Sequence, residues 1–403
     1  MSSRAKATWS VVEVLVLLSV GCGARTGLTL DSSSDADLGP APDVFGPFPC
    51  LFSPVGQAAP IREGPDQSFR GRMEFGGGRL GLLYNVADSP GSPTTPRLSF
   101  CFSIPYGDEV CSPETEVFHD GALNVAPLAW GGDVWGLCRG RAFETLSPGG
   151  APLTEVQTIG SPGSICRDLV ASASGYVASF ADTTDSPSIA TVAALDQSGV
   201  QIGEPLHTHE MTGPQTRLAA HDGMAIAAWA GPDWLVLRRL DGDGPYLEVL
   251  SEAEARVDHL DVALRRPIAG VFWHEHRDGS QVLLFRLVDM DRGQLATSVE
   301  VARPPNVAGL DIIAVNEGFV VAWLEWSEEG ADRIVVVPIG VDGWESSLFS
   351  ELVLYDEPHD ATLTDLGGPA MAYDERAVFV TFTRRDVSTG LYQVHFQQLD
   401  CHR

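Results

Sequence analysis

Two pairs of histidines are the residues whose spacing best fits a chemical role. His207 and His209 form one His-x-His pair, and His274 and His276 form the other. Side chains at i and i+2 on a β-strand point to the same face, so each pair presents two imidazoles to one metal ion. A metal site also needs further ligands and supporting partners, and ten histidines make chance pairs common. We therefore predict no metal or cofactor, and we keep His274 and His276 as the candidate ligands.

Acidic residues recur in short polar segments. Asp241–Gly244 and Asp289–Asp291 resemble fragments of calcium-binding loops, but neither continues to the bidentate Glu of an EF-hand. Because Asp-Gly is a preferred hairpin turn, we interpret both as turns. The carboxylates of Asp182–Asp185 and Glu325–Glu329 fit the acid and base of a glycosidase. With 54 acidic residues in the chain, solvated loops are the better interpretation of these segments.

Several function classes are excluded by the sequence. It has no Gly-x-Ser-x-Gly elbow, no P-loop and no dinucleotide-binding glycine motif after a strand. Lys6 is its one lysine, and it lies in a segment that we expect to be removed, which excludes a catalytic lysine from the mature chain. The net charge of −28 repels phosphate backbones, so we expect no nucleic-acid partner.

The N-terminus has the layout of a secretory signal. Arg4 and Lys6 precede the apolar segment Val11–Val20, and small residues follow before Cys22. This pattern resembles the lipobox of bacterial lipoproteins. The resemblance implies that residues 1–21 are removed, that Cys22 is acylated and that the mature chain is anchored to the lipid bilayer of a bacterial membrane.

The residue after the lipobox cysteine helps to determine which membrane a bacterial lipoprotein is sorted to. Gly23 occupies the position where an Asp often retains lipoproteins at the inner membrane, so the resemblance implies the outer membrane. Two alternatives remain open. Ordinary cleavage would leave a secreted protein with a Cys22 thiol, and an uncleaved anchor is disfavoured because the apolar segment is short of the about 20 residues that span a bilayer.

The rest of the chain divides by composition. Residues 22–49 are rich in Ser, Asp, Gly and Pro and are expected to form a flexible linker, because they cannot bury enough apolar surface to fold. Residues 50–403 form the folded domain. Apart from Cys22, six cysteines remain, an even number that predicts up to three disulfides in an exported protein, with buried free thiols as the alternative. These six are Cys50, Cys101, Cys111, Cys138, Cys166 and Cys401.

One strand pattern recurs about every 50 residues along the folded domain. Each copy is a largely apolar run that ends in or contains an aromatic residue, and five of the seven copies begin with Gly. The copies are residues 78–85, 132–138, 175–182, 223–230, 267–274, 318–325 and 376–383. Asp-Gly hairpins follow several of them. Seven units of four short strands predict an all-β fold, a seven-bladed β-propeller.

Packing and closure follow from that architecture. A four-stranded sheet with two apolar faces must stack against its neighbours, and a closed ring leaves only short edges. The aromatic residues at the ends of the second strands are expected to fill the wedges between blades: Tyr84, Trp135, Phe180, Trp229, Trp273, Trp323 and Phe382. The last unit is one strand short. We expect Leu51–Ile61 to supply that strand and a Cys50–Cys401 disulfide to lock the ring; a solenoid or two β-sandwiches are the alternatives.

The Gly-aromatic-Val-Val-x-Trp strand, best seen in GFVVAWLE at residues 318–325, resembles bacterial propeller lipoproteins. Fold alone does not give activity. The first hypothesis is a non-catalytic propeller that presents its loop face to a protein or glycan partner. The second is an exported carbohydrate hydrolase or lyase with acids meeting over the channel. Histidines and carboxylates with shifted pKa values at the channel would favour the enzyme, whereas a flat aromatic face would favour the binding protein.

Overall fold

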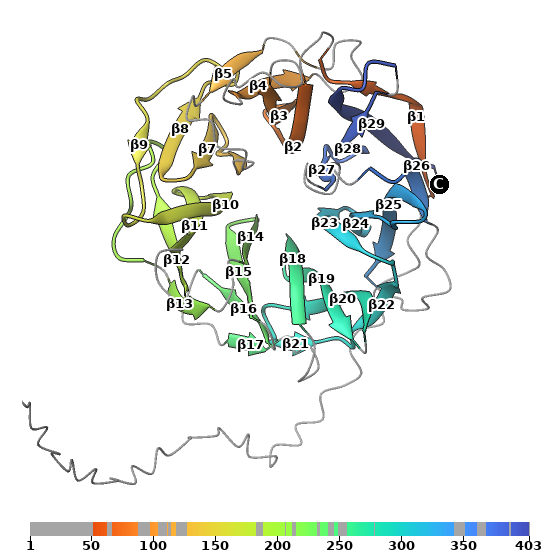
Figure 1. Ribbon diagram of the computed structural model, residues 1–403. Helices are drawn as coiled ribbons and strands as arrows, with labels where there is room; N and C mark the ends of the chain where they lie inside the picture. Colours follow the sequence, from red (N-terminus) through yellow and green to blue (C-terminus); the bar gives the residue numbers. More distant parts are fainter. Residues whose placement is uncertain are drawn as a thin grey trace, which may run out of the picture. The chain divides into compact units, whose positions relative to one another are not determined.

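Twenty-nine short strands form the described part of the chain, and no helix occurs within it. In the computed structural model these strands make seven antiparallel sheets arranged as blades around a central channel (Figure 1). The structure describes residues 51–62, 67–87, 97–103, 111, 114–117, 127–182, 188–205, 207–211, 215–231, 234–240, 246–248, 256–277, 279–341, 351–360, 368–386 and 388–402. The predicted seven-bladed propeller is confirmed.

Each blade is ordered from an inner strand at the channel to an outer strand at the rim. The first three blades are β2 (Gln67–Gly76), β3 (Arg79–Ala87), β4 (Arg97–Ser103) and β5 (Thr115–Val117); β6 (Leu128–Trp130), β7 (Trp135–Arg139), β8 (Ala142–Leu146) and β9 (Gln157–Thr158); and β10 (Ser164–Ser172), β11 (Gly175–Asp182), β12 (Ser188–Leu195) and β13 (His207–Met211).

The next three blades repeat this order, and the fifth blade has an additional outer strand, β22, paired with β20. They are β14 (Gln215–His221), β15 (Met224–Ala230), β16 (Leu235–Arg239) and β17 (Tyr246–Glu248); β18 (Arg256–Arg265), β19 (Ile268–Arg277), β20 (Ser280–Asp289), β21 (Gln294–Leu295) and β22 (Val299–Ala302); and β23 (Val307–Val315), β24 (Gly318–Glu325), β25 (Ala331–Gly340) and β26 (Leu352–Pro358).

The seventh blade joins the two ends of the folded domain. It consists of β27 (Ala370–Tyr373), β28 (Ala377–Arg385), β29 (Tyr392–His402) and β1 (Leu51–Pro60), in that order from the channel outward. β1 pairs with β29 antiparallel, with Leu51 opposite His402. The inner strands contact one another in sequence all the way around, from β2 through to β27 and back to β2. The prediction that Leu51–Ile61 closes the ring is therefore confirmed.

Apolar packing between blades forms the core. Seven buried clusters each join two neighbouring blades, and each contains one of the seven predicted aromatic residues. Trp273, for example, packs against residues of β15 and β16 in the preceding blade, and its side chain is 1% exposed. The second strands are continuous apolar runs because both faces of each blade are covered.

Trp135 departs from the prediction. It is the first residue of β7 rather than a residue near its end, and it packs against Phe100 of the preceding blade. A Cβ on Gly81 would lie 2.8 Å from the Trp135 ring, so only glycine admits the ring there. Phe319 packs over Gly270 in the same way, with a corresponding distance of 2.8 Å. Trp135 thus fills the wedge from the opposite end of the strand.

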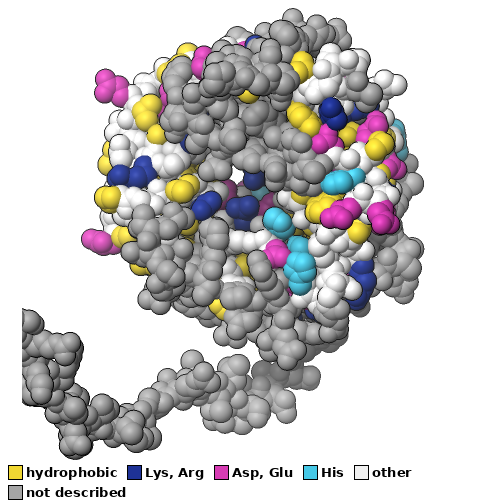
Figure 2. Space-filling view, in the orientation of Figure 1, with side chains coloured by type: hydrophobic (Ala, Val, Ile, Leu, Met, Phe, Trp, Pro, Cys, Tyr) yellow, Lys and Arg dark blue, Asp and Glu magenta, His cyan; other side chains and the backbone are white. Residues whose placement is uncertain are grey.

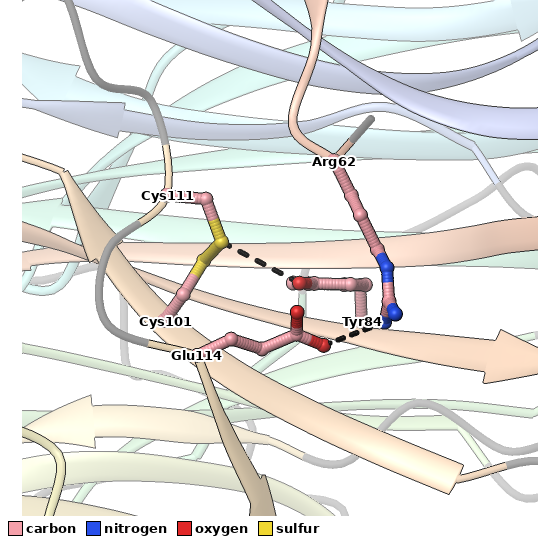
Figure 3. Close-up of a disulfide and its surroundings, with 5 residues drawn as sticks. All are labelled: Arg62, Tyr84, Cys101, Cys111 and Glu114. Carbon is pink, nitrogen blue, oxygen red and sulfur yellow. Dashed lines mark hydrogen bonds and ion pairs between the residues drawn. A yellow bond between two sulfur atoms is a disulfide. The ribbon is translucent and has the colours of Figure 1, made fainter. Parts of the chain in front are cut away.

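Two disulfides lie within the described part of the chain. Cys101 pairs with Cys111 inside the first blade, where the Tyr84 hydroxyl is 3.4 Å from Cys111 Sγ (Figure 3). Cys138 on β7 pairs with Cys166 on β10 and so links two blades. Disulfides persist in oxidising compartments, and both are consistent with an exported protein.

The predicted disulfide at the closure stays a prediction. Cys401 is disulfide-bonded, but Cys50 lies outside the described residues. The register of β1 with β29 begins at Leu51, which brings the chain after Cys50 to the end of β29. The predicted signal, residues 1–21, and the predicted linker, residues 22–49, also lie outside the described residues. Among those that are described, no helix has the length and apolar character to cross a membrane.

Candidate functional site

A belt of charged residues surrounds the middle of the channel. Asp168, Arg217, Asp261, Asp311 and Arg72 all line one cavity of about 170 Å³. In each of these blades, the charged residue on the inner strand pairs with a residue on the second strand, and the aromatic residue that fills the wedge comes directly after that partner. Asp261, for example, pairs with Phe272, and Trp273 follows. These five residues therefore occupy one level of the ring, and we call them the charged belt.

Two aspartates of the charged belt connect neighbouring blades. The Leu218 amide of the fourth blade donates to Asp168 of the third blade at 2.7 Å, and the Met371 amide of the seventh blade donates to Asp311 of the sixth at 2.6 Å. Asp168 also accepts from its own neighbouring amide, that of Leu169, at 2.9 Å. These carboxyl groups therefore hold inner strands together.

Burial shifts the pKa values of these acids. Burial raises the pKa of Asp168 to about 6, against the opposing effects of Arg217 and of the two amides. Burial also raises the pKa of Asp311 well above its ordinary value; the neighbouring Asp261 adds to this shift and Arg72 opposes it. Asp311 and Asp261 share a hydrogen bond, which requires a proton on one of the two carboxyl groups.

Glu74 lies one level below the charged belt, two residues after Arg72 on β2. The residues at this level in the other six blades are all apolar and line the same cavity of about 410 Å³ at that end of the channel: Ala129, Val170, Ala219, Ala263, Ile313 and Ala372. Burial in this surrounding, with Asp168 nearby, raises the pKa of Glu74 to about 8. The half-buried carboxyl group is therefore largely protonated at neutral pH.

Three arginines, Arg72, Arg167 and Arg217, line the cavity at the charged belt. Arg167 lies at the β-bulge of β10, and its Nε is buried without a hydrogen-bond partner among the described residues. Burial and the nearby Arg217 lower the pKa of Arg167. Arg217 Nε lies 3.7 Å from Asp261 Oδ1, outside hydrogen-bond distance. Arg72 and Arg217 also line a second cavity of about 180 Å³, which opens at the channel mouth.

Histidines lie beside this mouth. Figure 2 shows basic side chains in the central opening, with histidines to one side of it. His259 lines the mouth cavity and stacks on His274 with ring centroids 5.8 Å apart. His274 is 2% exposed, and burial lowers its pKa to about 4. His276 Nε2 pairs with Asp258 Oδ2 at 2.7 Å.

The predicted metal ligands, His274 and His276, are thus near each other, with ring centroids 5.2 Å apart. Their strand, β19, continues to Arg277, so they lie on the strand and not in the following loop. In the part of the chain that is described, no three His, Cys, Asp or Glu side chains are placed to hold a metal ion. His207 and His209 lie on β13. The assignment of metal ligands stays a prediction.

The acidic segments have local partners. Glu325 is the last residue of β24 and not a loop residue; it accepts a hydrogen bond from Trp323 Nε1 at 2.9 Å and pairs with Arg333 at 2.7 Å. Asp289 accepts the amides of Asp291 and Arg292, as expected of a turn. Asp185 and Asp241–Gly244 lie outside the described residues.

The charged belt itself was not predicted. The signal was a charged residue within or beside the apolar run of five of the seven inner strands, as in LDVAL at residues 260–264 and LDIIAV at 310–315. The repeat was recognised on the second strands, and the first strands were not aligned with one another.

Comparisons with known proteins support the fold. No protein family and no curated protein matches the sequence. The chain is similar to the WD40 domain of coronin from Toxoplasma gondii, with a TM-score of 0.50 and 6% identity over 89% of this chain and 88% of that chain. It is also similar to phage phi92 endosialidase, with a TM-score of 0.48 and 8% identity over 88% and 70% of the two chains. At this identity the likeness to the coronin domain supports the fold alone.

Proposed function

We propose that this chain is an exported, lipid-anchored protein of the bacterial cell envelope whose propeller binds a ligand or partner at the channel mouth and the surrounding loops without chemically changing it. The two disulfides support export. The lipobox-like segment that ends at Cys22 supports the anchor. A protein or a glycan is the partner class that fits an exposed loop face.

The observation that carries the proposal is that two acids of the channel, Asp168 and Asp311, make structural hydrogen bonds between blades. Asp168 and Asp311 each accept a backbone amide from the next blade, at 2.7 and 2.6 Å. A buried carboxyl group held in this way contributes to the closure of the ring, and its raised pKa is a consequence of that position. The shifted pKa values thus have a structural cause.

The cavities at the charged belt and at the mouth are too small to enclose a whole ligand. Ligand pockets typically measure roughly 300–1,000 Å³. The cavity that reaches the charged belt measures about 170 Å³, and the mouth cavity above it about 180 Å³. We therefore place the bulk of a molecule that enters at the mouth above Arg72 and Arg217, which line both of these cavities.

A carbohydrate hydrolase or lyase is the second candidate. Burial makes Glu74 a proton donor near neutral pH, with a pKa of about 8, and the hydrogen-bonded carboxyl groups of Asp261 and Asp311 lie one level above it. A general acid beside a carboxylate is the arrangement that glycoside hydrolysis uses. Incubation with polysaccharides and an assay for new chain ends separates the candidates: the binding protein produces none.

The lipid anchor gives a prediction of its own. Replacement of Cys22 with serine removes the thiol that would carry the lipid, so nearly all of the protein is expected to move from the membrane pellet to the soluble fraction. Cys401→Ser is the matched control, because it removes a cysteine of the folded domain and leaves the protein in the pellet. Retention of Cys22→Ser in the pellet after a high-salt wash would contradict lipidation.

A further inference from the structure

We propose that the channel mouth binds an oxyanion group of the ligand, a carboxylate or a phosphate, between Arg72 and Arg217. This inference rests on the proposed function and adds the chemical class of the bound group. Both arginines line the mouth cavity as well as the belt cavity below it. An anion that enters from the mouth therefore meets these two guanidinium groups before it meets any carboxylate of the channel.

The guanidinium groups have hydrogen-bonding capacity to spare. Arg72 interacts with Asp311 through charge and makes no hydrogen bond with a described residue. Arg217 donates from Nη1 to the carbonyl of Thr216 at 3.3 Å and lies 3.7 Å from Asp261. A guanidinium carries five N–H donors in a planar fork that matches carboxylate and phosphate oxygens. An oxyanion would supply the acceptors that the described side chains do not.

The local charge favours an anion in spite of the net charge of −28. Burial and the nearby Arg217 both disfavour the charge of Arg167. Burial raises the pKa of Asp311 well above its ordinary value and raises the pKa of Glu74 to about 8. Three cations therefore outweigh the carboxylates that remain ionised, and an anion would relieve the repulsion between the two arginines.

The size and rim of the mouth limit what enters. The cavity measures about 180 Å³, enough for a small group and too little for a whole ligand by the typical range of roughly 300–1,000 Å³. Gly309 and Gly368 form part of the rim, where a Cβ on Gly309 would lie 2.8 Å from Gly368 Cα. We infer that one acidic group of the ligand enters end-on.

The test is thermal unfolding of the full chain, purified in detergent, in a titration with sodium acetate, sodium galacturonate or sodium phosphate. Sodium chloride at equal ionic strength is the reference. Salts such as phosphate also stabilise proteins generally by exclusion from the surface, so the variants decide the result. These are Arg72→Gln and Arg217→Gln, with Arg292→Gln as the matched control, because Arg292 is a surface arginine with 55% exposure.

We expect a saturable rise in the melting temperature of the wild type and of Arg292→Gln with at least one of these anions. The apparent dissociation constant is expected to rise about tenfold or more in Arg72→Gln and Arg217→Gln, the effect of losing one charge-assisted hydrogen bond. A response to galacturonate and acetate assigns the group to a carboxylate, and a response to phosphate assigns it to a phosphate ester.

Two outcomes would overturn the inference. One is a shift that does not saturate with any of the anions, and the other is the same saturable shift in all four proteins. If Arg217→Gln does not fold because it loses its ion pair with Asp261, Arg72→Gln decides the result, since Arg72 interacts with Asp311 through charge alone. Binding of a neutral glycan without turnover, equal in wild type and Arg72→Gln, would contradict the oxyanion site and leave the proposed function standing.

Discussion

Deletion of Leu51–Pro60 from the full chain is expected to abolish the cooperative unfolding transition of the propeller. β1 supplies the outer strand of the seventh blade, and its register with β29 joins seven residue pairs, from Leu51 opposite His402 to Pro60 opposite His395. At about 1 kcal/mol of net stability per hydrogen bond, loss of this ladder removes on the order of several kcal/mol, a large share of the stability of roughly 5–15 kcal/mol typical of a domain. The deletion also exposes the edge of β29.

The measurement is circular dichroism or tryptophan fluorescence during thermal unfolding, with a deletion of residues 31–40 as the matched control. That control removes ten residues from the predicted linker and is expected to leave the melting temperature unchanged. A deletion of Leu51–Pro60 that still unfolds cooperatively near the wild-type temperature would mean that the ring does not depend on the N-terminal strand.

Glu74→Gln is expected to make the protein more stable at alkaline pH and to leave it unchanged at acidic pH. The folded chain holds the pKa of Glu74 at about 8, against an ordinary value of 4.5. Below about pH 4.5 the carboxyl group is protonated in both the folded and the unfolded chain, so burial of Glu74 does not lower the free energy of unfolding. Between about pH 4.5 and pH 8 the unfolded chain releases a proton that the folded chain keeps, so stability falls as the pH rises. Above about pH 8 the carboxyl group is ionised in both states, and the loss of stability has reached its full value.

Glutamine has no proton to release, so it avoids this cost. We expect Glu74→Gln to exceed the wild type by on the order of 3 kcal/mol at pH 9, allowing for screening by water in the channel. Denaturant unfolding at pH 5, 7 and 9 measures the difference, and Glu155→Gln, at an exposed position, is the control. An advantage that does not grow between pH 5 and pH 9 would show that Glu74 is not enclosed as described.

The blades could be predicted because two-sided burial leaves a simple signal. A strand covered on both faces must be apolar throughout, and a large ring is needed to fill the wedge between twisted sheets. Phe319, Val320, Val321, Ala322 and Trp323 on β24 show both features. Closure was predictable as well, because the last unit lacked one strand and the segment after Cys50 had no other partner.

The candidate site was not predictable because its inner strands are irregular. β-Bulges interrupt β2, β10, β18 and β23 shortly before the charged belt, for example between Val257 and His259. A bulge shifts the alternation of side chains, so the face on which Asp261 lies cannot be read from a period of two. Blade 2 shows the same limit, since the strand expected at residues 132–138 begins at Trp135.

The contacts between blades also lay beyond the sequence. Asp168 and Leu218 are 50 residues apart, and nothing in either segment identifies the other as its partner. In the sequence analysis, shifted pKa values at the channel were the feature that would favour an enzyme over a binding protein. The structure shows that such shifts are present and that backbone amides of neighbouring blades account for the positions of Asp168 and Asp311. A shifted pKa therefore does not distinguish an enzyme from a binding protein unless the hydrogen-bond partners of the acid are also known.

The most direct test of the central claim is the mass of a bound ligand recovered from the protein. The full chain is incubated with acidic and neutral polysaccharide fragments, the complex is separated from free fragments, and the released ligand is analysed by mass spectrometry. We predict that at least one class of fragment is retained and recovered at its original mass, because the acids of the channel hold blades together and lie below the mouth. Recovery of shortened fragments would contradict this account and identify the protein as an enzyme.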